Sequence, residues 1–105
     1  MIKVWYKKPG EIGRCLWIHN TLRAFQELVD GPIEVVRLSD PKHVILVNEE
    51  ALLRGNMHLN IIVGPHFLFG PLVVVGVDKE DFTDCTLDAA QVRRLLAKQG
   101  GGIHG

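Results

Sequence analysis

Residues 20–36 read NTLRAFQELVDGPIEVV, and this stretch contains the best-marked element in the chain, a helix that is followed by a strand. Asn20 or Thr21 can accept a hydrogen bond from the free N–H groups of a first helical turn. Apolar residues then recur at helical spacing, which predicts an amphipathic helix with one buried face. Gly31 supplies a left-handed stop, so the β-rich run at 33–38 begins a strand.

Other elements are predicted on both sides of this unit. The chain opens with alternating apolar and polar residues over 2–7, a period of two that is typical of a strand. The apolar run His43–Val47 is typical of a strand buried on both faces. Residues 72–77 form the most plausible centre of the sheet. The remaining predicted elements are strands at 14–19, 61–63 and 67–69, an acidic connection at 78–84, and a C-terminal helix that starts near Thr86 as N-cap and ends before Gly100.

These elements predict an α+β fold in one small domain, residues 1–99, followed by a flexible Gly-rich tail, residues 100–105. The predicted order is β-β-α-β-β-β-β-α. It gives a mixed, mainly antiparallel sheet with two helices packed on one face. Hairpin-length connections favour antiparallel neighbours, while the helix after the second strand permits one parallel crossover.

Composition and charge narrow the class of protein. The 105 residues total 11.7 kDa, are 47% hydrophobic and carry twelve basic and twelve acidic side chains. This balance argues against a general nucleic-acid binder and against a polybasic membrane-surface protein. The longest apolar stretch, 61–77, is interrupted by glycine and proline and is unfit for a membrane helix. The N-terminus lacks the apolar core of a secretory signal, so we expect a cytoplasmic protein.

Metal and cofactor chemistry has no support in the sequence. Cys15 and Cys85 are the only cysteines, lie far apart and are expected to stay reduced. The five histidines show no spacing typical of a zinc site, and no Gly-rich phosphate-binding motif occurs. We therefore expect neither a metal nor a cofactor.

The polar segment from Asn48 to Asn60 is the first candidate for a functional surface, because binding groups often lie on loops held by a rigid sheet. Its polar side chains could together hold a phosphate or a carboxylate, and Phe69 adds a face on which a base could stack. Turn chemistry alone also explains this segment, because asparagine caps turns, Gly55 permits positive φ and charges solvate a loop. The predicted ligand-binding residues are Asn48, Glu49, Glu50, Arg54, His58, Asn60 and Phe69.

Two tryptophans lie on the strands that the first hairpin would join. Alternation can place Trp5 and Trp17 on the same face of this hairpin. If no helix covers that face, the rings are exposed and mark a contact surface. If a helix covers it, both rings belong to the core.

Three groups of motifs, in this order, resemble one family. They are Asn20-Thr21-Leu22 with Leu28-Val29, Gly31 and Ile33-Glu34-Val35-Val36; Val47-Asn48-Glu49-Glu50 with Gly55 and Asn60; and Phe69-Gly70-Pro71 with Gly76 and Asp81-Phe82. Over residues 1–98 the chain is similar to domain of unknown function 3846, small proteins encoded by phages, plasmids and integrative elements of bacteria. The resemblance implies an origin in a mobile genetic element, and it implies no characterised chemistry.

The residues and this resemblance together predict a non-enzymatic binding protein of a phage or mobile element. It would engage a host protein or sequester a small anionic, nucleotide-like ligand, with host takeover or counter-defence as the natural context. Homo-oligomerisation would help so small a chain to build a closed pocket. The alternative is a small hydrolase or nuclease that uses Glu49, Glu50 and His58 in acid–base catalysis. Glu49 and Glu50 are a poor pair on an extended segment, because adjacent residues point to opposite faces.

Overall fold

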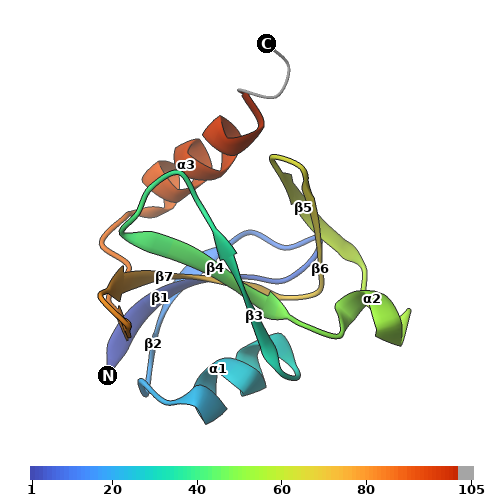
Figure 1. Ribbon diagram of the computed structural model, residues 1–105, viewed down its shortest axis with the longest axis horizontal. Helices are drawn as coiled ribbons and strands as arrows, with labels where there is room; N and C mark the ends of the chain where they lie inside the picture. Colours follow the sequence, from blue (N-terminus) through green and yellow to red (C-terminus); the bar gives the residue numbers. More distant parts are fainter. Residues whose placement is uncertain (102–105) are drawn as a thin grey trace.

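The computed structural model describes residues 1–101, and side chains as far as Lys98 (Figure 1). Its strands are β1 (Ile2–Lys7), β2 (Arg14–Ile18), β3 (Ile33–Arg37), β4 (His43–Asn48), β5 (Leu59–Val63), β6 (His66–Phe69), β7 (Leu72–Asp78) and β8 (Asp81–Thr83). Its helices are α1 (Leu22–Val29), α2 (Ala51–Arg54) and α3 (Ala89–Gly101). Within this part of the chain, no helix combines the length and apolar character that a membrane crossing requires.

The C-terminal helix extends further than the sequence predicted. The flexible tail was predicted for residues 100–105, but α3 continues to Gly101. Glycine weakens a helix without forbidding helical φ and ψ, so the glycines at this end do not stop it at once. The rest of the predicted tail, residues 102–105, lies outside the described residues.

The α+β class and the mainly antiparallel sheet are confirmed. Five strands of the main sheet follow the order β2-β1-β7-β4-β3, and a sixth, β8, pairs with β7. All of these pairs are antiparallel. β7 lies at the centre, as its continuous apolar run predicted. β5 and β6 form a separate two-stranded hairpin.

Helices α1 and α3 cover opposite faces of the sheet, as Figure 1 shows with α1 below and α3 above. Phe25 and Val29 of α1 are buried against one set of side chains from β1, β4 and β7. Val92 and Leu96 of α3 pack on the other face, with Trp5 and the β5–β6 hairpin. The prediction of both helices on one face is therefore wrong. Every residue of β4 and most of β7 are buried, so each face of the sheet needs its own cover.

The first helix is capped by the predicted residue at its start but not at its end. Thr21 Oγ1 accepts a hydrogen bond from the backbone N–H of Ala24 at 3.1 Å. The left-handed residue that follows α1 is Asp30, with φ of 63°, rather than the predicted Gly31. Aspartate tolerates this conformation better than most residues, so the helix ends one position earlier.

The last helix also starts at a different residue from the one predicted. It begins at Ala89, and its cap is Asp88 rather than Thr86. Asp88 Oδ1 accepts from the backbone N–H of Gln91 at 2.8 Å, and Gln91 Oε1 accepts from the backbone N–H of Asp88 at 2.9 Å. This reciprocal pair satisfies two N–H groups of the first turn, which a lone threonine upstream could not do.

The structure has eight strands, one more than the seven segments predicted as strands, and the additional strand is β8. It lies within the predicted acidic connection, and the chain turns back towards β7 through Lys79, with φ of 58°. Phe82 of β8 packs edge to face on Phe25, with ring centroids 5.1 Å apart. Acidic residues disfavour strands. Pairing with β7 and this aromatic contact outweigh that preference.

The two tryptophans share a face of the β1–β2 hairpin but not an environment. Trp17 lies opposite Lys3, and Trp5 opposite Cys15, so both rings project from the same side. Trp5 is 2% exposed within the core under α3, whereas Trp17 is 63% exposed on the edge strand. The core interpretation therefore holds for Trp5 alone, and only Trp17 is a surface residue.

A buried histidine joins the start of β4 to the segment before α3. The backbone N–H of Thr86 donates to His43 Nε2 at 3.2 Å, so Nδ1 carries the proton and donates to Asp40 Oδ2 at 3.0 Å. Burial raises the pKa of Asp40. The hydrogen bonds from the Lys42 N–H, at 2.7 Å, and from His43, together with nearby positive charge, lower it by more, so the net pKa lies below its ordinary value.

Replacing Asp40 should change the acid side of the stability profile. Its folded-state pKa lies below the unfolded value of about 3.9. The carboxylate therefore stabilises the fold above that pH, and this stabilisation is lost as the pH falls through the folded-state pKa. We expect wild-type protein to lose stability below about pH 4 more steeply than Asp40→Asn does. Urea unfolding at a series of pH values measures this difference.

The exposed Glu80, on the turn before β8, provides the control. Glu80→Gln should keep the wild-type dependence of unfolding free energy on pH. Parallel acid profiles for wild type and Asp40→Asn would contradict a stabilising role for the Asp40 carboxylate.

Candidate binding pocket

Asn48 joins the end of α1 to the start of α2 and is almost completely buried, at 2% exposure. Its Nδ2 donates to the backbone oxygens of Val29 and Asp30, at 3.1 and 2.8 Å. Its Oδ1 accepts from the backbone N–H of Glu50 at 2.7 Å. A Cβ at Gly31 would lie 2.6 Å from Asn48 Nδ2, so the glycine makes room for this amide. The polar atoms of Asn48 are therefore used inside the fold.

Arg54, predicted to grip an anion, is instead bound to the end of α1. Its Nη1 donates to the backbone oxygen of Asp30 at 2.6 Å, and its Nη2 lies 3.1 Å from Asp30 Oδ2. The interaction fixes the last residue of α2 against the residue that ends α1. The guanidinium is thus already paired with a carboxylate, which reduces its attraction for an external anion.

Asn60 ties the β5–β6 hairpin to the main sheet. Its Nδ2 donates to the backbone oxygens of Lys7 and Gly70, both at 2.8 Å. Its Oδ1 accepts from Lys7 Nζ at 2.6 Å. Both amide N–H groups and the amide oxygen therefore have partners within the chain. The register of β5 and β6 shifts between Leu59 and Ile61, which leaves Asn60 outside the pairing.

The three residues of the predicted acid–base group do not gather around one cavity. Glu49 lines a pocket, whereas Glu50 and His58 are exposed and line neither this pocket nor three other cavities of the described residues. Glu50 is the N-cap residue of α2 but makes no capping hydrogen bond with its side chain. This arrangement offers no common position for a substrate between the three side chains.

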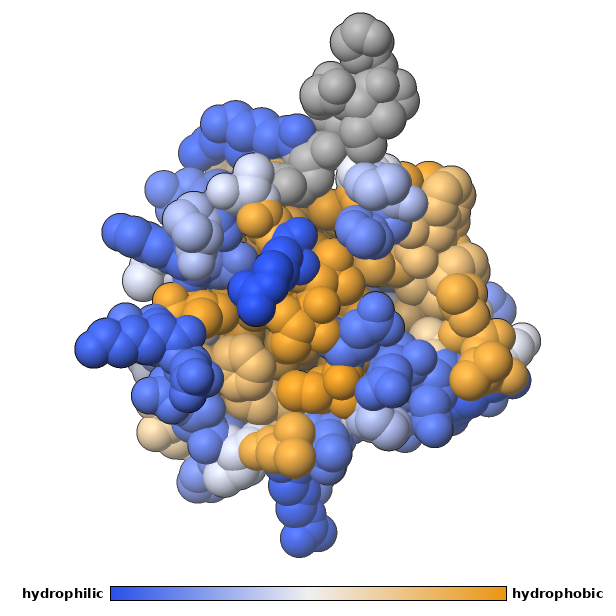
Figure 2. All heavy atoms as spheres, in the orientation of Figure 1, coloured by the Kyte–Doolittle hydropathy of each residue, from blue (hydrophilic) through white to orange (hydrophobic). Residues whose placement is uncertain are grey.

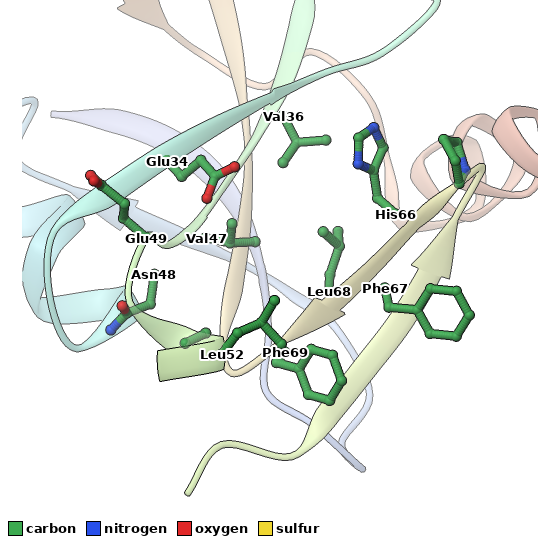
Figure 3. Close-up of a pocket in the computed structure, with 12 residues that line it drawn as sticks. Glu34, Val36, Val47, Asn48, Glu49, Leu52, His66, Phe67, Leu68 and Phe69 are labelled. Carbon is green, nitrogen blue, oxygen red and sulfur yellow. The ribbon is translucent and has the colours of Figure 1, made fainter. Parts of the chain in front are cut away.

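One pocket does collect three of the seven predicted residues, Asn48, Glu49 and Phe69 (Figure 3). It is a cavity of about 510 Å³ between β3, the end of β4, α2 and β6. We call it the acidic pocket, and its lining residues are Glu34, Val36, Val47, Asn48, Glu49, Ala51, Leu52, Pro65, His66, Phe67, Leu68 and Phe69. In Figure 3 the buried side chains of Val36, Val47 and Leu68 form its apolar floor.

Apart from Asn48, the polar side chains of the acidic pocket have no partner among the described residues. Figure 3 shows the Glu34 and Glu49 carboxylates on one side of the pocket and the His66 ring on the other, near Val36. Glu34, Glu49 and His66 are all exposed, and their side chains make no hydrogen bond or ion pair with residues 1–98. Two unpaired carboxylates beside an apolar floor favour a cationic group that carries an apolar neighbour.

Nine of the twelve lining residues were not among the predicted site residues, and these nine include Glu34, Leu52, His66 and Phe67. Period-two alternation along the run 33–38 could have indicated part of the pocket, because it places Glu34 and Val36 on the same face of the strand. The hairpin that completes the pocket is remote from β3 in the sequence, so this alternation cannot indicate what faces Glu34. His66 and Phe67 carry no motif that distinguishes them from ordinary strand residues.

Other reactive groups form no second centre in the described part of the chain. Cys15 is an exposed free thiol and Cys85 a buried one. Burial raises the pKa of the Cys85 thiol and so reduces its reactivity. Among the side chains described, no three His, Cys, Asp or Glu residues are grouped so as to hold a metal ion.

Comparison with known proteins assigns a family. The model of the family described as Domain of unknown function (DUF3846) matches residues 2–98, nearly the whole chain, and confirms the family that the motifs indicated. Comparison with curated proteins and with solved structures finds no significant match.

Replacement of Asn48 should destabilise the fold, whereas replacement of its neighbour Glu49 should not. Asn48→Ala removes three hydrogen bonds and leaves the backbone oxygen of Val29 and the N–H of Glu50 without these partners, while the Asp30 oxygen keeps its bond from Arg54. We expect it to lower the free energy of unfolding by about 2 to 4 kcal/mol. Glu49→Gln alters an exposed side chain and should change that free energy by less than about 0.5 kcal/mol. Urea unfolding followed by circular dichroism measures both, and similar losses would contradict this division.

Proposed function

The chain belongs to the DUF3846 family, and we propose that it is a non-enzymatic protein-binding module of a phage or other mobile genetic element. Its partner is a host protein, which it engages through the acidic pocket. The expected context is takeover of the host or counter-defence. The partner segment carries a lysine or arginine next to a large apolar side chain.

The observation that carries this proposal is the pairing of an apolar floor with unpaired carboxylates. Val36, Val47 and Leu68 supply apolar surface in a cavity large enough for a side chain from a partner. Glu34 and Glu49 stand beside this surface without a cation of their own. A basic side chain on the partner would therefore gain charge-assisted hydrogen bonds while its apolar neighbour enters the cavity.

Exposed apolar side chains around the pocket favour a protein partner over a small molecule. Leu52 on α2 is 73% exposed and Phe67 on β6 is 60% exposed. Leu53 and Ile62 add further apolar surface on the same two elements, α2 and the β5–β6 hairpin. Figure 2 shows apolar side chains gathered at the side of the molecule where Figure 1 places these elements. Clusters of this kind mark interaction sites on proteins of this size.

The charges of the pocket give less support to a small anionic ligand. The cation expected to bind such a ligand, Arg54, is paired with Asp30, and the amides of Asn48 and Asn60 have partners within the chain. Glu34 and Glu49 would repel a phosphate placed between them. Of the two occupants that the sequence predicted, the protein segment therefore has the better support at this site.

Removing the two carboxylates should weaken the binding of basic peptides. Short random peptides displayed on phage and selected on the wild-type protein should be enriched in Lys or Arg beside Leu, Ile, Met or Phe. A selected peptide should bind Glu34→Gln/Glu49→Gln at least about tenfold more weakly, because two charge-assisted contacts are lost. Binding to wild type should also weaken with added salt. Isothermal calorimetry measures the affinities.

Glu50→Gln provides a matched control, because Glu50 is an exposed neighbour of Glu49 that does not line the pocket. It should keep wild-type affinity. Selected peptides without basic residues, or equal affinities for the double variant and the control, would contradict the proposal.

A further inference from the structure

A second cavity, of about 520 Å³, lies between the loop before β2, strand β5 and helix α3. We call it the Trp5 cavity, and its lining residues are Trp5, Lys7, Glu11, Ile12, Gly13, Ile61, Ile62, Arg93, Leu96 and Ala97. It shares no lining residue with the acidic pocket. What it binds is therefore a separate question from the proposed function.

The walls of the Trp5 cavity are mostly apolar. The Trp5 indole and Leu96 provide buried surface, and β5 adds Ile61 and the half-exposed Ile62. Ile12, on the loop before β2, is 87% exposed although it lines the cavity. A cavity of this volume with mostly apolar walls and few polar groups matches the usual site for a small organic ligand.

The charged groups of the cavity carry an excess of positive charge. Lys7 and Arg93 contribute two cations, against the single carboxylate of Glu11. Lys7 Nζ is already held by Asn60 Oδ1 at 2.6 Å. Arg93 is exposed and forms no ion pair or hydrogen bond with the side chains that the structure describes. Its guanidinium is thus the cation available to an acidic head group.

Trp5 holds an unsatisfied donor. Its Nε1 is the one buried side-chain nitrogen or oxygen without a hydrogen-bond partner among the residues described. A Cβ at Gly13 would lie 1.9 Å from the indole ring, so the glycine lets the loop before β2 pack directly on Trp5. A buried N–H without an acceptor is costly, so the fold leaves one polar group of a cavity-lining residue unsatisfied.

We infer that the Trp5 cavity binds a small amphipathic anion, whose apolar body lies against Trp5, Ile61 and Leu96 and whose single acidic head group pairs with Arg93. The apolar walls select the body of the ligand, and the excess of cations selects its charge. The acidic pocket has the opposite charge and is therefore unsuited to the same ligand.

The experiment uses the full chain carrying Trp17→Phe, which leaves Trp5 as the only tryptophan. Trp17 is exposed, so this replacement leaves the core unchanged. The probe is anilinonaphthalene sulfonate, an aromatic molecule with one acidic group, which accepts excitation energy from a nearby tryptophan. We expect saturable quenching of Trp5 with a stoichiometry of one probe per chain. Absence of saturable quenching would overturn the proposal.

Two neighbouring arginines on α3 test the position of the head group. Arg93 lines the cavity and Arg94 does not, although both are exposed. Arg93→Ala should weaken probe binding by about fivefold to tenfold, and Arg94→Ala should leave it unchanged. The neutral analogue N-phenylnaphthylamine should bind both variants equally. Equal affinities of the two variants for the sulfonate would overturn the proposal.

A further pair of variants distinguishes this cavity from the acidic pocket. Ala97→Phe fills the Trp5 cavity from an exposed position on α3 and should abolish energy transfer from Trp5. Leu52→Ser alters the acidic pocket and should leave the transfer unchanged. If Leu52→Ser lowers the transfer as much as Ala97→Phe does, the probe binds in the acidic pocket and the proposal fails.

Discussion

The rest of the structure depends on the burial of both faces of the two central strands. All six residues of β4 are buried, as are the first five of β7. Each large apolar side chain that is buried there contributes about 1.5 to 3 kcal/mol relative to exposure, on whichever face it lies. A single layer of helices would leave half of this surface in water. The chain therefore places α1 on one face and α3 with the β5–β6 hairpin on the other.

The sequence predicts those parts of the fold whose signals are local. The apolar stripe of α1, its Thr21 cap and the central position of β7 could all be read from spacing alone. The prediction of a one-sided sheet failed because a continuous apolar run shows that a strand is buried but not which elements cover it. β8 was missed for a similar reason: its pairing with β7 and the contact between Phe82 and Phe25 depend on residues that are distant in sequence.

The candidate site also depends on contacts between residues that are distant in the sequence, which local patterns do not predict. Asn48, Arg54 and Asn60 have the side chains of ligand-binding residues, but their partners are atoms of this chain, many of them backbone oxygens at other ends of the fold. The spacing of residues in the sequence does not predict these hydrogen-bond partners. Glu34, Glu49 and Arg93 line the two cavities without a partner among the described residues, and in the sequence they look like ordinary solvated charges. The side chains that can bind a ligand are therefore identified only when those already hydrogen-bonded within the fold are set aside.

The position of β7 has a consequence for the order in which the molecule can assemble. β1 pairs with β7 and β4 pairs with β7, so the hairpins β1–β2 and β3–β4 meet only through a strand that begins at Leu72. During synthesis, residues 1–71 leave the ribosome before β7, so the two hairpins cannot yet share a sheet. Their apolar faces stay uncovered until β7 has been synthesised. Long-range pairing of this kind slows folding and exposes a chain to aggregation. A nascent chain of this protein would therefore gain from synthesis that does not pause before the codons of β7.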